Sequence, residues 1–236
     1  MSQLLTITGL KSFYGASQAL HGVDLTVRRG EQIALIGRNG MGKTTLLKSI
    51  VGLLADRRGE IRFADACTLK AKPEDIARKG LAYVPEGRGV FGSLSVVENL
   101  VMAARAGVSG SRAWTIDRVF EVFPRLHQRR MNGGHQLSGG EQQMLSIGRA
   151  LMTNPDLVIL DEATEGLAPL IAQEIWKTLG IIRSEGIATI VVDKDFRSLS
   201  KVADRMVVMA KGEIAFDGMP AQMQADPAIL EKHLGV

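Results

Sequence analysis

The sequence predicts an α/β fold with a mostly parallel sheet, an antiparallel β part at the N-terminus and an inserted α-helical subdomain. Short apolar runs alternate with helical patterns along much of the chain, as they do in a parallel sheet covered by helices. Between residues 88 and 152 only helical patterns occur, which indicates an insertion. We expect a single domain over residues 1–236, with a core at 1–87 and 153–236 and a helical subdomain at 88–152.

Apolar runs and period-two alternation define the expected strands. Residues 4–8 and 23–27 alternate apolar and polar side chains, as half-buried strands do, and residues 11–15 are expected to form a loop between them. Further strands are expected at residues 33–36, 59–63, 81–84, 157–160, 188–192, 206–209 and 213–216.

Capping residues and prolines define the expected helices. They are expected at residues 73–79, 95–105, 115–123 and 168–185, after Pro220 and Pro227, and from the run 137–141 to about residue 152. The positive charges at residues 125–130 are interpreted as a solvated helix end in preference to a nucleic-acid patch.

Composition narrows the class of protein. The chain has 236 residues, of which 45% are hydrophobic, so it can bury a substantial core. A formal net charge of +4 gives no argument for nucleic-acid binding. The lone Cys67 cannot form an internal disulfide, and no apolar run approaches the roughly 20 residues that span a bilayer. With no signal-peptide pattern at the N-terminus, we expect a soluble, cytoplasmic protein.

The stretch at residues 37–45, GRNGMGKTT, fits the pattern G-x-x-x-x-G-K-[ST]. Glycines let a backbone curl with its N–H groups inward around phosphate oxygens, and the helix that opens at Leu46 would direct its positive dipole end at them. Lys43 would reach the β- and γ-phosphates, and the Thr44 hydroxyl would ligate Mg²⁺. The sequence therefore predicts a P-loop NTPase core that binds a nucleoside triphosphate. The expected nucleotide-binding residues here are Gly37, Arg38, Asn39, Gly40, Met41, Gly42, Lys43, Thr44 and Thr45.

Two further motifs carry chemistry. The apolar strand at residues 157–160 ends in Asp161 and Glu162, which after a phosphate loop suggest a metal ligand and a water activator, although a structural carboxylate pair is the alternative. Ser138 and Glu141 have capping-box spacing, so the run LSGGE could simply be a well-capped helix start. Its adjacent glycines weaken the first helical turn, which makes sense if a ligand approaches the backbone N–H groups closely.

In this order, the phosphate loop, the LSGGE run and the strand ending in Asp-Glu resemble the nucleotide-binding subunit of ABC transporters over nearly the whole chain. The resemblance implies that Tyr14, otherwise an ordinary core aromatic, stacks on adenine. It implies that Asp161 holds Mg²⁺, partly through water, and that Glu162 polarises the attacking water. It also implies that ATP is sandwiched between two subunits, where the signature of one contacts the γ-phosphate bound by the other. The signature residues are Ser138, Gly139, Gly140 and Glu141.

The chain departs from the family pattern at three positions. Glu86 stands where many members have Gln, in the loop that contacts Mg²⁺ and the membrane subunit; an acid can face Mg²⁺ but cannot donate a hydrogen bond as an amide does. Lys194 aligns with a His near the γ-phosphate, where it supplies charge without tautomer chemistry. Ala168 stands where Asp is common. These changes bear on the hydrolytic rate, and we expect Lys43, Glu162 and Lys194 to be the catalytic residues.

The runs VPEGR at residues 84–88 and GLAP at 166–169 resemble the ATPase subunit of branched-chain (hydrophobic) amino-acid importers. That resemblance implies a second ATPase subunit in a hetero- or homodimer, two membrane permease subunits and a separate solute-binding protein, with this chain peripheral on the inner face of the membrane. Importers of urea or short amides share much of the pattern. The motifs also fit a non-transport ABC ATPase or a weakly hydrolytic nucleotide switch.

Overall fold

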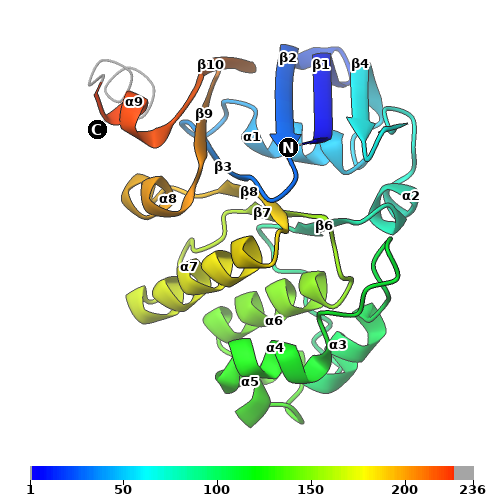
Figure 1. Ribbon diagram of the computed structural model, residues 1–236, viewed down its shortest axis with the longest axis vertical. Coiled ribbons are helices and arrows are strands. Elements are labelled where there is room, and N and C mark those ends of the chain that lie inside the picture. The colour runs from blue at the N-terminus through cyan, green and yellow to red at the C-terminus, as the bar shows by residue number, and fades with distance from the viewer. Residues whose placement is uncertain (1, 226–236) are drawn as a thin grey trace.

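A computed structural model describes residues 2–225, and its strands form two sheets stacked over a set of helices (Figure 1). The antiparallel sheet has the order β2-β1-β4-β5. Its strands are β1 Gln3–Tyr14, β2 Ser17–Arg28, β4 Asp56–Phe63 and β5 Ala66–Cys67. The central sheet has the order β10-β9-β3-β8-β7-β6, and every neighbouring pair in it is parallel except β9 with β10. Its strands are β3 Gln32–Ile36, β6 Leu81–Val84, β7 Leu157–Asp161, β8 Ala188–Val192, β9 Arg205–Ala210 and β10 Glu213–Gly218. The predicted α/β class is confirmed.

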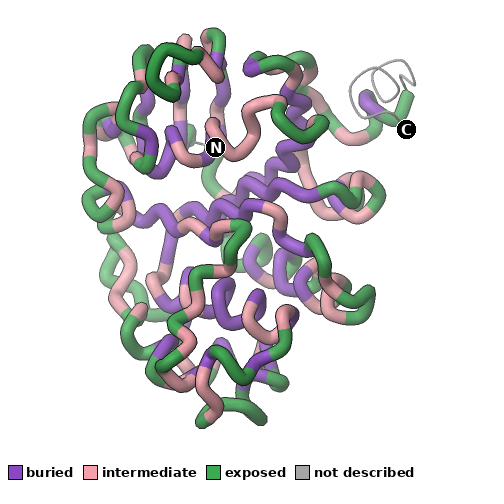
Figure 2. Tube along the Cα trace, turned by 180° about the vertical axis from the view of Figure 1, so that it is seen from behind, coloured by how far each residue is buried: buried purple, intermediate pink, exposed green. Residues whose placement is uncertain are grey.

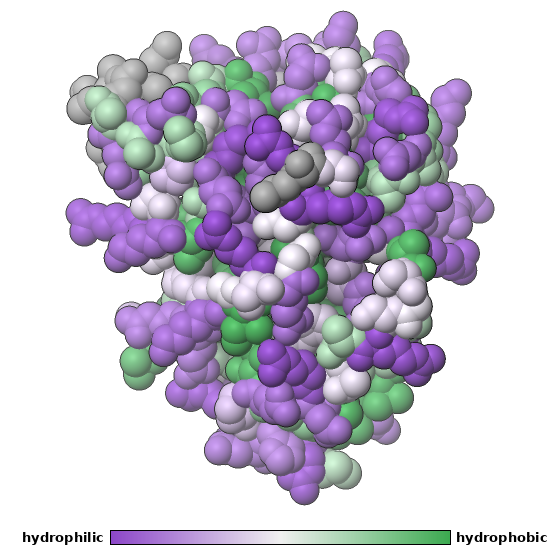
Figure 3. Space-filling model, in the orientation of Figure 1, coloured by the Kyte–Doolittle hydropathy of each residue, from purple (hydrophilic) through white to green (hydrophobic). Residues whose placement is uncertain are grey.

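The helices cover the central sheet and fill the segment between β6 and β7. They are α1 Lys43–Ile50, α2 Pro73–Arg78, α3 Val96–Ala103, α4 Ile116–Val122, α5 Pro124–Gln128, the 3-10 helix η1 Gly134–Gln136, α6 Gly139–Leu151, α7 Pro169–Ser184, α8 Phe196–Val202 and α9 Pro220–Gln224. Figure 3 shows a mostly hydrophilic face, with small hydrophobic patches over the part that α3 to α6 occupy. None of the helices within residues 2–225 is long and apolar enough to cross a membrane.

The central sheet packs against a hydrophobic core on each face, because successive side chains of a strand point to opposite faces of the sheet. On β3, Ile33 and Leu35 belong to the core shared with α1 and the antiparallel sheet, whereas Ala34 and Ile36 belong to the core shared with α6 and α7. All residues of β3, β7 and β8 are buried, and the tube drawn in Figure 2 is accordingly purple through the middle of the molecule. This is why these strands are continuous apolar runs without alternation.

The loop expected at residues 11–15 is wrong, because β1 continues through Tyr14. The pairing of β1 with β2 shifts register between Ile7 and Leu10, next to Gly9 at φ 56°, so the alternation changes phase within one strand. The other strands and helices expected within residues 2–225 are present, with ends shifted by a few residues. The sequence patterns do not indicate β5 or α8, and α5 occupies most of the basic stretch 125–130. The helix expected after Pro227 lies outside the described residues.

Candidate functional site

The glycine-rich loop joins β3 to α1 and has a backbone that only glycine fits well. Gly37 has φ 145° and Gly42, the N-cap of α1, has φ 102°. A Cβ atom on Gly37 would lie 2.4 Å from the carbonyl oxygen of Met209 on β9. The loop is therefore pressed against the neighbouring strand, with the start of α1 directly behind it.

In front of this loop lies a polar cavity of about 570 Å³. Six residues of the predicted phosphate loop line it: Asn39, Gly40, Gly42, Lys43, Thr44 and Thr45. Glu162 lines it from the end of β7. The structure thus brings the expected general base and the expected phosphate-binding residues to one cavity.

Lys43 lies folded back over its own loop. Its Nζ donates hydrogen bonds to the carbonyl oxygens of Gly37, at 2.6 Å, and Arg38, at 3.0 Å. Burial lowers the pKa of Lys43, and the nearby Asp161 carboxylate opposes that shift. An ammonium held by two carbonyls is positioned to exchange them for phosphate oxygens.

Asp161 is buried and accepts two side-chain hydrogen bonds. Thr44 Oγ1 lies 3.4 Å from Asp161 Oδ1, and the Tyr83 hydroxyl lies 3.1 Å from Asp161 Oδ2. Burial raises the pKa of Asp161, while the two hydrogen bonds oppose the rise. Burial also raises the pKa of Tyr83, so its hydroxyl remains a donor. A threonine hydroxyl beside a buried carboxylate is an oxygen donor set that fits Mg²⁺.

Three acidic side chains meet beyond the end of β7. Carboxylate oxygens of Glu86, Glu162 and Glu165 all lie within 4.8 Å of one another. Glu162 has φ 55°, a left-handed conformation that is uncommon for a residue other than glycine. Lys194 forms an ion pair with Glu165. The sequence led us to expect Glu86 beside Mg²⁺, Glu162 beside the attacking water and Lys194 near the γ-phosphate, but it did not identify Glu165.

A buried aspartate ties together the loops that carry these groups. Asp193 Oδ2 accepts from both the backbone N–H and the hydroxyl of Thr164, each at 2.7 Å. Asp193 Oδ1 accepts from the backbone N–H of Asp195 at 2.9 Å. The loop after β7 and the loop after β8 are therefore clasped, which places Glu165 beside Lys194.

The signature residues lie at the start of α6 and do not line the cavity. Ser138 and Glu141 form a capping box, with Glu141 N–H 3.3 Å from Ser138 Oγ and Ser138 N–H 2.8 Å from Glu141 Oε2. A Cβ on Gly140 would lie 2.7 Å from Ile171 of α7, so this glycine also has a packing reason. The LSGGE sequence alone is therefore no proof that this helix start contacts a ligand.

Tyr14 is 49% exposed at the tip of the β1–β2 hairpin and is not among the residues that line the cavity. It pairs with Ser17, the first of three consecutive hairpin residues that do line it. The cavity also has His21, Lys211 and Gly212 in its wall, none of which we expected. A Cβ on Gly212 would lie 2.3 Å from the carbonyl oxygen of Ala19, so only the fold reveals why this turn belongs to the site.

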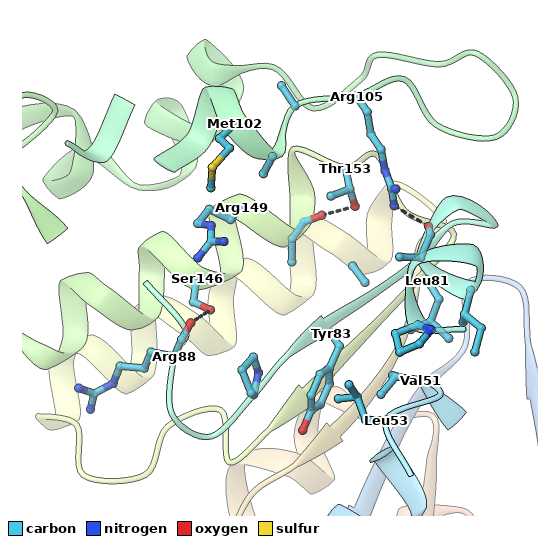
Figure 4. A pocket seen from close by; sticks show the side chains of 18 residues that line it. Val51, Leu53, Leu81, Tyr83, Arg88, Met102, Arg105, Ser146, Arg149 and Thr153 are labelled. Carbon is cyan, nitrogen blue, oxygen red and sulfur yellow. Dashed lines mark hydrogen bonds between the residues drawn. The ribbon is translucent and has the colours of Figure 1, made fainter. Parts of the chain in front are cut away.

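A second cleft, of about 600 Å³, lies where β6 meets α2, α3 and α6 (Figure 4). Leu53, Leu81 and Met102 give it apolar walls, and Arg88, Arg105 and Arg149 add positive charge. Arg88 belongs to the loop that follows β6 and contains Glu86, so this cleft shares a segment with the acidic group of the first cavity. Tyr83 also lines it.

Comparison with known proteins identifies relatives along the whole chain. The family described as ABC transporter matches residues 20–165. The high-affinity branched-chain amino acid transport ATP-binding protein BraG of Pseudomonas aeruginosa is 39% identical, over 98% of this chain and 100% of BraG. The lipopolysaccharide export system ATP-binding protein LptB of Haemophilus influenzae is 32% identical, over 98% and 97%. A solved ATP-binding subunit of an ABC transporter superimposes with a TM-score of 0.84 at 29% identity, over 96% and 94%.

Proposed function

Because the chain belongs to the ABC transporter family, whose ATPase subunits bind and hydrolyse ATP, we propose that it powers an importer of branched-chain or other hydrophobic amino acids. The observation that carries this proposal is the 39% identity to the branched-chain amino acid subunit over 98% of this chain and 100% of that subunit. The lipopolysaccharide export subunit, at 32%, makes export the weaker candidate.

The site supports a division of labour among its residues. Lys43 and the N–H groups of residues 37–45 hold the phosphates, and Tyr14 stacks on the adenine. Thr44 and Asp161 hold Mg²⁺, with Glu86 facing it. Mg²⁺, when bound, neutralises charge on the phosphate oxygens.

Glu162 performs the proton chemistry of hydrolysis. It lines the phosphate cavity, and its carboxylate accepts a proton of the attacking water as the water oxygen bonds to the γ-phosphorus. The bond between the γ-phosphorus and the β–γ bridging oxygen breaks in the same displacement, so that ADP leaves with that oxygen and inorganic phosphate is released. Lys194, held by Glu165 at the edge of the acidic group, supplies positive charge on the γ-phosphate side. General-base assistance of this kind contributes about 10²–10⁴-fold to a rate.

A second ATPase subunit completes each site. Ser138 and Gly139 lie outside the cavity of their own chain, at the start of a helix whose N–H groups favour anions. Pairing two subunits head to tail brings this helix start to the nucleotide of the partner. The residues of one chain therefore form about half of each of two sites.

The second cleft is the proposed contact with the membrane subunits. Its apolar walls and its arginines fit a short amphipathic segment with an acidic residue. Phe91, 46% exposed, follows the Glu86 loop and stacks under the Arg149 guanidinium at 4.5 Å. A chain docked here lies peripherally on the inner face of the membrane, beside two permease subunits that receive solute from a separate binding protein.

Phosphate release tests the enzymatic part of this proposal. We expect the purified chain, mixed with its partner ATPase subunit, to lose at least about 100-fold of its rate in Glu162→Gln while ATP binding persists. Glu121→Gln, on an exposed helix face, is the matched control and should hydrolyse normally. Equal rates in Glu162→Gln and the original chain would remove Glu162 as the base.

Uptake in cells tests the transported solute. Cells lacking this gene, complemented with the original chain or with Glu162→Gln, are assayed with labelled leucine, urea and acetamide. We expect leucine uptake to depend on the original chain. Unchanged leucine uptake together with loss of urea or acetamide uptake would refute the amino-acid assignment and leave the ATPase assignment standing.

A further inference from the structure

We propose that Tyr83 is a positioning residue that links the second cleft to the carboxylate of Asp161. Its hydroxyl lies 3.1 Å from Asp161 Oδ2, and the same side chain lines the cleft. Figure 4 shows the Tyr83 ring between the cleft and the strand behind it, with its oxygen directed away from the residues of α6. One side chain therefore lines the second cleft and also contacts Asp161 of the proposed Mg²⁺ site.

The hydroxyl fixes the orientation of the Asp161 carboxylate. With Oδ2 held by Tyr83, Oδ1 is the oxygen that faces Thr44, at 3.4 Å. Both Thr44 and Asp161 belong to the proposed Mg²⁺ site. Outer partners that orient a ligating carboxylate in this way affect metal affinity by about 10–100-fold when they are removed.

The backbone around Tyr83 is fixed, whereas its ring is not fully enclosed. Tyr83 lies on β6, in register with Ile159 of β7, and its neighbours Ala82 and Val84 are buried. The ring is only half-buried because the cleft lies against it. Because the tyrosine ring is rigid and its oxygen lies on the χ2 axis, a segment that enters the cleft and changes χ1 of Tyr83 also moves the hydroxyl away from Asp161.

This inference rests on the proposed function only for the identity of the segment that fills the cleft. The link itself is a property of the isolated chain. By reciprocity, a change at Asp161 when Mg²⁺ and ATP bind also changes the cleft wall. A test on the isolated chain therefore needs neither a permease nor a transported solute, and its failure is separable from failure of the importer assignment.

Equilibrium binding of ATP at graded MgCl₂, with an EDTA reference, tests the positioning role. In Tyr83→Phe we expect the Mg²⁺ concentration that gives half of the affinity gain to rise about tenfold, with the EDTA affinity unchanged. Thr189→Val is the matched control, because its buried hydroxyl has no hydrogen-bond partner and Thr189 pairs with Val158, three residues before Asp161 along β7. An unchanged Mg²⁺ dependence in Tyr83→Phe, or an equal shift in Thr189→Val, would overturn the proposal.

Thiol labelling tests the connection to the cleft. Leu53 is 55% exposed and lines the cleft, so Leu53→Cys in a Cys67→Ser background reports on its wall. We expect Mg²⁺ with ATP to change the labelling rate of this cysteine, and we expect that change to be lost when Tyr83→Phe is added. A response that is identical with and without the Tyr83 hydroxyl would refute the link.

Discussion

Ser138 caps α6, and we propose that it also contacts the γ-phosphate of the ATP bound by the partner subunit. The two roles can be separated by comparing Ser138 with Ser95. Each serine is the N-cap of a helix and forms a complete capping box, Ser138 with Glu141 and Ser95 with Glu98. Replacement by Ala removes a cap worth about 1 kcal/mol. In a chain of this length that lowers the melting temperature by about 2–4 °C. We expect this loss of stability from both variants.

Only Ser138→Ala should also slow turnover strongly. If its hydroxyl stabilises the transferred phosphoryl group, its loss costs about 10²–10³-fold in rate, as for other donors that face developing negative charge. Calorimetry gives the melting temperatures, and phosphate release with the partner ATPase subunit gives the rates. Full hydrolysis by Ser138→Ala, or an equal loss of rate in Ser95→Ala, would refute the assignment of the signature and leave Ser138 as a helix cap.

Three further substitutions have defined outcomes. Gly37→Ala puts a Cβ 2.4 Å from the Met209 carbonyl oxygen at φ 145°, a strain of about 1–3 kcal/mol, so fluorescent-nucleotide titration should show at least a fivefold loss of affinity. Asn99→Leu removes a buried amide that bonds the loop ahead of its helix, and urea unfolding should show a loss of about 3 kcal/mol. Lys194→Ala should slow phosphate release while the melting temperature stays nearly constant, because its ion pair with Glu165 is exposed and contributes about 0–1 kcal/mol.

The sequence best predicts those features that depend on residues close together in the chain. The phosphate loop is a run of consecutive residues, so its cavity can be expected without knowledge of the fold. The central strands are apolar because helices or a second sheet cover both of their faces. The alternation of apolar and polar residues underestimates the length of β1, because the register shift next to Gly9 interrupts that alternation. The shift arises from pairing with the neighbouring strand. The sequence does not predict α8, although Asp195 caps it. Leu199 is the sole fully buried residue of this helix, so no repeating apolar pattern marks it.

Contacts between distant segments could not be predicted. Tyr83 and Asp161 are 78 residues apart, and the helical segment lies between them in the chain; they meet because β6 and β7 are neighbours in the sheet. Glu165 becomes the partner of Lys194 only because Asp193 clasps the loops after β7 and β8. Sequence patterns name the groups of a site, whereas sheet order decides which groups become neighbours.

Glu86 and Lys194, the two charged departures from the family pattern near the proposed γ-phosphate position, can be explained together. Glu86, where the resemblance leads us to expect Gln, brings a carboxylate to a group that also contains Glu162 and Glu165, with oxygens within 4.8 Å of one another. Like charges this close repel one another. Lys194, where the resemblance leads us to expect His, carries a positive charge and pairs with Glu165, which offsets part of that repulsion. The acid at 86 and the lysine at 194 therefore change the local charge in opposite directions around Glu162, the residue that we propose as the general base.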